Sequence, residues 1–205
     1  MGFGDLSLER LIAGAVALLV GLTFHEFSHA LVADTLGDRR PRAMGRLTLN
    51  PIAHVDPIGA LMLVVAGFGW AKPVMVNPAA LRGGRRSMAL VAFAGPIANV
   101  VVATVFAVGF RAMDLAGISN GFALNLVALI VQLNILLAIF NLIPIPPLDG
   151  YNVALAYLPS RQALIVQQYA PYGVIVLLLL IFIPGSPLRT ILGLAAPIAR
   201  VLIGA

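Results

Sequence analysis

The chain has 205 residues, of which 60% are hydrophobic and 10% are charged, with a mean hydropathy of +1.01. This composition excludes an ordinary soluble domain and predicts an all-α polytopic membrane protein built as one domain over residues 1–205. Because the chain has no cysteine, a bound metal would need histidine and carboxylate ligands. The net charge of +5 is explained more simply by arginines in cytoplasmic loops than by an anionic partner, so we expect no nucleic-acid binding.

The first apolar run carries a metal-binding pattern. Residues 8–36 are predicted to form one helix, about 43 Å long at 1.5 Å per residue, which exceeds the ~30 Å hydrocarbon core of a bilayer. Within it, Phe24 to His29 read F-H-E-F-S-H. Residues four apart share a helix face, so His25 and His29 can bind one cation, and Glu26 lies about 100° round the helix, where a general base belongs.

A structural alternative is a pair of core histidines beside a stray glutamate. An uncompensated carboxylate costs about 2.5–3.5 kcal/mol or more at membrane depth, so such a residue is normally kept for a function. The metal-site interpretation is therefore the stronger one.

The next region is irregular and basic. Arginines at 39, 40, 42 and 46 favour the cytoplasmic side. Residues 46–49 and 70–76 are predicted to be strand-like and to form a small sheet near the membrane face. Residues 58–69 are apolar but too short to cross as a helix, so we interpret them as re-entrant.

The rest of the chain alternates apolar helices with breaks. Residues 87–110 and 122–143 are predicted to span the membrane, and 151–158 to form a short helix after a proline-rich kink. Residues 163–183 could span, and 188–203 either span or lie at the interface. We therefore expect about 4–6 transmembrane helices, with a core over residues 8–155 and C-terminal helices over 160–205.

A catalytic zinc site needs three protein ligands and an open position. Most carboxylates outside the H-E-x-x-H pattern sit beside arginines or at helix ends, where we expect solvated charges. Asp149 instead follows an apolar helix in a kink rich in proline and glycine. If 58–69 is re-entrant, Asp149 also reaches the same leaflet as His25 and His29. We choose it as the third ligand.

Three separated motifs carry a resemblance to a family. H-E-F-S-H at 25–29, G-P-I-A-N at 95–99 and N-L-I-P-I-P-P-L-D-G at 141–150 resemble the site-2 proteases, which are intramembrane zinc metalloproteases. Residues 50–59 and 69–78 look like the compact bacterial and archaeal branch, which lacks an inserted PDZ domain. The resemblance implies a multi-pass protein of a prokaryotic cell membrane, with its active site towards the cytoplasmic leaflet.

The resemblance also assigns roles to residues. His25, His29 and Asp149 would bind one Zn²⁺ per chain, and Glu26 would activate a water molecule for attack on a peptide carbonyl. Asn141 would steady the oxyanion, although a helix-terminal asparagine bonded to freed backbone explains it equally well. The substrates would be membrane-spanning helices of other proteins, in the lipid bilayer. The oligomeric state stays open.

Two further polar residues have competing interpretations. Asn99 could hydrogen-bond another helix, and Gly95 would permit close packing beside it; we favour structural support over chemistry for this pair. His54 could approach zinc or substrate, but a loop histidine bonded to backbone is the simpler interpretation.

Two other function classes compete with the protease. One is a membrane scaffold whose zinc site is structural or silent, against which Glu26 argues. The other is an ion or solute transporter that uses His25, Glu26 and Asp149 as a permeation site. Transporters with broken helices usually have duplicated halves, and the sequence has no clear repeat.

Overall fold

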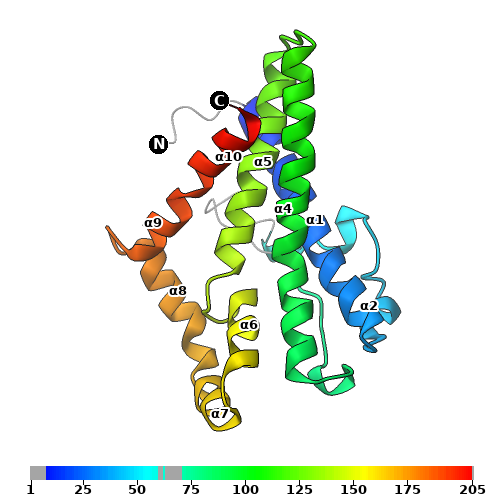
Figure 1. The fold of residues 1–205 in the computed structure, drawn as a ribbon, viewed down its shortest axis with the longest axis vertical. Helices are drawn as coiled ribbons and strands as arrows, with labels where there is room; N and C mark the ends of the chain where they lie inside the picture. The colour runs from blue at the N-terminus through cyan, green and yellow to red at the C-terminus, as the bar shows by residue number, and fades with distance from the viewer. Residues whose placement is uncertain (1–7, 60–61, 63–70, 205) are drawn as a thin grey trace.

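The structure is a computed structural model that describes residues 8–59, 62 and 71–204. Its centre is a bundle of three long helices, α1 (Leu8–Thr35), α4 (Arg85–Leu115) and α5 (Gly121–Asn141), each packed against the other two. The three apolar helices predicted from the sequence are therefore confirmed (Figure 1). The second of them is longer than predicted, because α4 continues through Arg111 and Asp114.

Shorter helices flank this bundle on two sides. In Figure 1, α2 lies on one side of α1, α4 and α5, while α8, α9 and α10 rise along the other. The short helices are α2 (Arg40–Ala43), α6 (Asp149–Tyr157), α7 (Ser160–Gln168), α8 (Gly173–Phe182), α9 (Pro187–Gly193) and α10 (Ala195–Ile203). Single 3-10 turns occupy Pro51–Ala53, Pro78–Ala80 and Ala170–Tyr172.

The three central helices are long and apolar enough to cross a membrane, by length and composition. The predicted span at 163–183 is broken, because the chain bends by 46° between Ser160–Gln168 and Ala170–Phe182, where a proline cannot continue the helix. It counts as a fourth span only if the bent pair is taken as one. The region 188–203 consists of two helices of 7 and 9 residues, neither long enough to cross alone.

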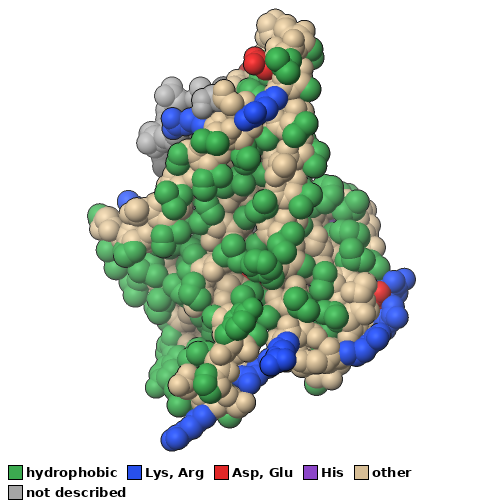
Figure 2. Space-filling model, viewed as in Figure 1, with side chains coloured by type: hydrophobic (Ala, Val, Ile, Leu, Met, Phe, Trp, Pro, Cys, Tyr) green, Lys and Arg blue, Asp and Glu red, His purple; other side chains and the backbone are tan. Residues whose placement is uncertain are grey.

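The surface agrees with a membrane location. Figure 2 shows hydrophobic side chains spread across the visible face, with Lys and Arg side chains gathered along the lower edge and near the upper end. Many large apolar residues are exposed on the central helices, including Val105 and Val108 of α4 at 62% and 64%. Such a surface would be unfavourable in water and is favourable in lipid.

The predicted sheet is absent from the described part of the chain. Residues 47–48 form a bend, and 46 and 49 belong to no regular element. The pairing found among the described residues is one isolated antiparallel bridge between Val55 and Ala71. Arg46 explains the difference, because its buried guanidinium donates to the carbonyls of Ala53 and Lys72 instead of facing solvent from a strand. Most of the segment predicted as re-entrant, 58–69, and Trp70 lie outside the described residues.

Two carboxylates expected to be solvated are buried. Asp34, 3% exposed, binds the guanidinium groups of Arg39 and Arg42. Asp38, 1% exposed, binds Arg40 and also accepts the Asn77 N–H at 2.6 Å. Residues 71–77 are called the 71–77 segment below. The Asn77–Asp38 hydrogen bond attaches this segment to the loop that follows α1.

Candidate metal centre

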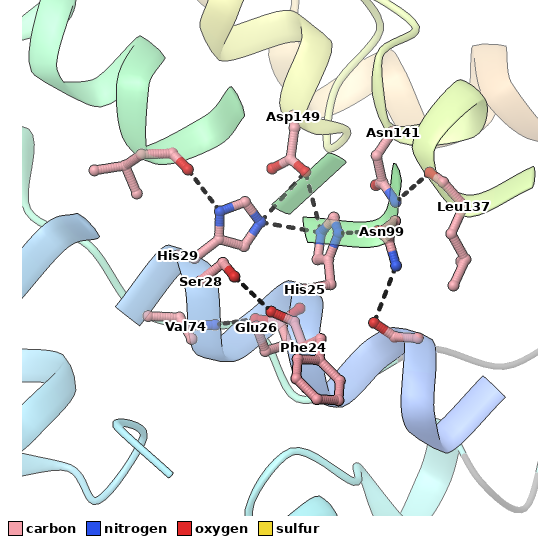
Figure 3. Close-up of polar contacts among 12 residues, drawn as sticks. Phe24, His25, Glu26, Ser28, His29, Val74, Asn99, Leu137, Asn141 and Asp149 are labelled. Carbon is pink, nitrogen blue, oxygen red and sulfur yellow. Dashed lines mark hydrogen bonds and ion pairs between the residues drawn. The ribbon is translucent and has the colours of Figure 1, made fainter. Parts of the chain in front are cut away.

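Three side chains from two helices converge at one point (Figure 3). His25 and His29 project from α1, and Asp149 is the first residue of α6. The two Nε2 atoms are 3.0 Å apart, and Asp149 Oδ2 lies 3.1 Å from His25 Nε2 and 3.3 Å from His29 Nε2. Ligands held 2.0–2.1 Å from a tetrahedral zinc ion are about 3.3 Å from one another, so these spacings are close to those that zinc requires.

The chemistry of this donor set also fits a cation. Asp149 Oδ2 is buried and accepts no hydrogen bond of good geometry, although both imidazoles lie beside it. Within residues 8–59, 62 and 71–204, no other group of three His or acidic side chains is arranged to hold a metal.

The outer nitrogens of both imidazoles are held by α4. His29 Nδ1 lies 2.7 Å from the Val91 carbonyl, which can only accept, so this nitrogen carries the hydrogen. His25 Nδ1 lies 2.7 Å from Asn99 Oδ1. The Asn99 amide donates to Gly21 O at 3.1 Å and to Asn134 Oδ1 at 2.9 Å, which leaves Asn99 Oδ1 as the acceptor. Both Nε2 atoms therefore carry a lone pair, and both lie beside Asp149 Oδ2.

Gly95 allows α4 to approach the histidines. A Cβ atom at this position would lie 2.5 Å from His25 Cε1 and 2.5 Å from His29 Nε2, closer than real Cβ contacts. Any larger residue would push the imidazoles out of place. The G-P-I-A-N motif thus supplies space at Gly95 and, one turn later, a hydrogen-bond partner at Asn99, as the sequence suggested.

A tight return of the chain directs Asp149 towards α1. After α5 ends at Asn141, a proline-rich loop leads into α6, which packs against α4. A Cβ atom on Gly150 would collide with the backbone of Leu142 and Ile143, so only glycine permits this close return. In the D-G pair, Asp149 supplies the carboxylate, and Gly150 lets the first turn of α6 pack against the backbone of Leu142 and Ile143.

Glu26 is held from another direction. Its side chain is buried, and Oε2 accepts the backbone N–H of Val74 at 3.0 Å. In Figure 3, Asp149 lies above the histidines, and Glu26 and Val74 lie below them. Glu26 therefore lies beside the two histidines but outside the group of possible ligand atoms.

Two other predicted site residues make the contacts of their structural alternatives. Asn141 donates an amide hydrogen to Leu137 O at 3.0 Å. His54 is 2% exposed and its Nε2 lies 2.8 Å from Thr48 O, outside the group of ligand atoms. Sequence reasoning did not single out Asn134, although a polar residue in an apolar helix is a usable signal. No sequence signal identifies the Val91 carbonyl or the Val74 N–H.

Comparisons with known proteins identify relatives. The model of "Peptidase family M50" matches residues 110–183. The Bacillus subtilis protein named "Putative zinc metalloprotease YwhC" is 39% identical over 175 residues, which cover 82% of this chain and 80% of that protein. The proteins named "Putative zinc metalloprotease Rip2" from Mycolicibacterium smegmatis and Mycobacterium tuberculosis H37Rv are 28% and 31% identical, over 81% of this chain and 65% of theirs. No solved structure matches.

Proposed function

The chain belongs to peptidase family M50, the site-2 protease family, and we propose that it is a zinc metalloendopeptidase that cleaves within the membrane. Its substrates would be other membrane proteins, cut in or near their transmembrane segments. The observation that carries this proposal is the convergence of His25, His29 and Asp149, with Glu26 beside them, on helices apolar enough to lie in a bilayer.

One zinc ion per chain would be held by the Nε2 atoms of His25 and His29 and by Asp149 Oδ2, leaving a fourth position open. Zinc, when bound, supplies a Lewis acid that acidifies water and polarises the substrate carbonyl. Glu26 would take the proton of the attacking water and later deliver it to the leaving amine. Asn141 uses one amide hydrogen for Leu137 O, and its second could donate to the developing oxyanion.

A peptide bond in a helix is shielded by its own backbone, so the substrate must unwind before it is cut. The 71–77 segment, which adjoins Glu26 through Val74, could hold the unwound peptide by β-addition. The 46–49 segment supports this idea less well, because Arg46 turns inward and donates to the carbonyls of Ala53 and Lys72. Normal cleavage of a membrane substrate after deletion of residues 73–76 would rule out a role for this segment.

The proposed orientation places the active site towards the cytoplasmic leaflet of a prokaryotic cell membrane, in a multi-pass protein. The support is the clustering of arginines between the end of α1 and the first turn of α4, at positions 39, 40, 42, 46, 82, 85 and 86. In Figure 2, basic side chains line the lower edge, where Figure 1 has α7 and the beginning of α4.

The proposal is tested by cleavage of a generic transmembrane reporter in detergent, with zinc counted in the same samples. We expect product from the wild type, and a loss of about 10²–10⁴-fold in Glu26→Gln, with one zinc per chain in both. Zinc in both and product in neither, across several reporters, would favour the scaffold. A folded protein without bound metal would contradict the proposal.

A further inference from the structure

Asn134 of α5 is a buried polar residue that the proposed reaction does not use. It is 0% exposed in a helix that is mostly apolar. Its Oδ1 accepts an amide hydrogen of Asn99 at 2.9 Å, and its own Nδ2 donates to the Ile130 carbonyl at 2.8 Å. Asn99, also 0% exposed, is the residue that binds His25. Two buried asparagines therefore connect α5 to a metal ligand on α1.

These hydrogen bonds have a fixed direction. The Ile130 carbonyl can only accept, so Asn134 must turn its NH₂ group towards it and its Oδ1 towards Asn99. Asn99 must then turn its NH₂ group towards Asn134 and Gly21, and its Oδ1 towards His25. His25 Nδ1 has to supply the hydrogen of that last bond.

The direction matters for metal binding. A neutral imidazole carries one N–H, and with that hydrogen on Nδ1 the Nε2 lone pair is free for a metal. If the Asn99 amide turned over, its NH₂ group would face His25 Nδ1. That arrangement favours the hydrogen on Nε2, where it blocks the ligand position. His29 does not need this protection, because its Nδ1 bonds directly to the Val91 carbonyl.

The packing of α1 against α5 is compatible with the same role. A Cβ atom on Gly21 would lie 2.7 Å from Leu137 Cδ1 and 3.3 Å from Asn134 Oδ1. Glycine at this position therefore lets α5 come close enough for Asn134 to join Asn99 beside the Gly21 carbonyl.

We propose that Asn134 is a positioning residue that acts through Asn99 to hold His25 in its metal-binding tautomer. This inference rests on the proposed zinc protease function and deepens it. Asn134 touches neither metal nor substrate, so it is not a catalytic residue. Substitution of Asn134 should therefore change the affinity for zinc even when no substrate is present.

The test is the zinc affinity of Asn134→Leu, measured by competition with a chromophoric chelator. We expect zinc binding to weaken by about 10-fold, the lower end of the range for residues bonded directly to a metal ligand, because the Gly21 carbonyl still holds one amide hydrogen of Asn99. Gln132→Leu, an exposed position of the same helix, is the matched control and should leave the affinity unchanged. Asn134→Asp keeps an acceptor for Asn99 and should restore the affinity to within a few-fold of wild type.

If Asn134→Leu does not fold, Asn134→Ala takes its place, because alanine adds no bulk beside Gly21. It should show the same loss of zinc affinity. Nitrogen NMR of the zinc-free protein should find the His25 hydrogen on Nδ1 in the wild type and distributed over both nitrogens in the Leu or Ala variant. Unchanged zinc affinity in that variant, or an equal loss in Asn134→Asp, would overturn the proposal. A wild type that binds no zinc would instead overturn the proposed function.

Discussion

His25, His29 and Asp149 are held inside the packed helices, whereas Glu26 is bonded to a segment outside them. On the metal side, α4 contributes Val91 O, Asn99 and the space at Gly95. On the side of the base, the Val74 N–H comes from the 71–77 segment. That segment is bonded to the rest of the chain near its two ends, through Lys72 N–H to His54 O and Asn77 N–H to Asp38.

This contrast separates two kinds of control. The ligand geometry is set once α1, α4, α5 and α6 pack, because its supports are buried helix backbone and buried side chains. The orientation of Glu26 depends on a short segment without helix or strand, which a bound peptide would also meet. We therefore expect changes on the metal side to alter zinc affinity, and changes on the base side to alter turnover with zinc retained.

The largest effect is expected from Gly95→Ala. Its methyl group would occupy space within 2.5 Å of both imidazoles, so zinc binding should weaken on the order of 100-fold or more in a chelator competition. Gly109→Ala in the same helix is the matched control, because a Cβ atom there meets nothing within 4 Å. Normal zinc affinity in Gly95→Ala would show that α4 does not set the ligand positions.

On the base side, Val74→Pro removes the backbone N–H that donates a hydrogen bond to Glu26 Oε2. A hydrogen bond to a charged group contributes about 1.5–3 kcal/mol, so kcat on a transmembrane reporter should fall by about 10–100-fold with zinc content unchanged. Val74→Ala keeps the N–H and should retain activity. Equal kcat in the Pro variant and the wild type would show that the 71–77 segment does not control the function of Glu26.

A smaller effect is expected from Asp38→Ala, which releases Asn77 at the far end of the same segment. The variant also leaves Arg40 without its partner, so stability should fall by about 1–3 kcal/mol. Turnover should fall a few-fold, and zinc affinity should not change, which thermal unfolding and chelator competition would test. Weaker zinc binding would mean that the two sides are coupled.

The sequence predicted the central helices because long apolar runs leave few alternatives. The spacing of four predicted that His25 and His29 share one helix face, and their Nε2 atoms do lie 3.0 Å apart. Sequence reasoning failed for residues 46–49, where an alternating pattern suggested a strand but Arg46 turns inward to bind carbonyl groups. Nor did it anticipate that Asp34 and Asp38 would be buried, since local sequence shows neighbouring arginines but not how deep a carboxylate lies.

The supports of the site were harder to predict than its ligands. Asn99 stood in a recognisable motif, whereas Asn134 was one of several polar residues in α5 and only packing distinguishes it. The contacts made by Val91 and Val74 use backbone atoms, which every residue type carries. Such contacts depend on how distant segments meet, and a single sequence does not record that.

The smallest effect is expected at the opposite end of the bundle. Arg111 of α4 donates to the carbonyls of Val201 and Leu202, the last turn of α10, at 2.8 and 2.7 Å. Arg111→Met should lower the thermal unfolding temperature by about 2–4 °C and leave zinc affinity and turnover unchanged. A loss of zinc in this variant would show that α10 supports the metal side from a distance.

The central claim is that two histidines and one carboxylate hold a single zinc ion. X-ray absorption at the zinc edge, on purified protein with zinc counted per chain, tests it most directly. We predict one zinc per chain with two imidazole nitrogens and oxygen ligands at about 2.0–2.2 Å, and an unchanged spectrum in His54→Ala. A third imidazole, a spectrum altered by His54→Ala, or zinc retained in full by Asp149→Ala would contradict the account.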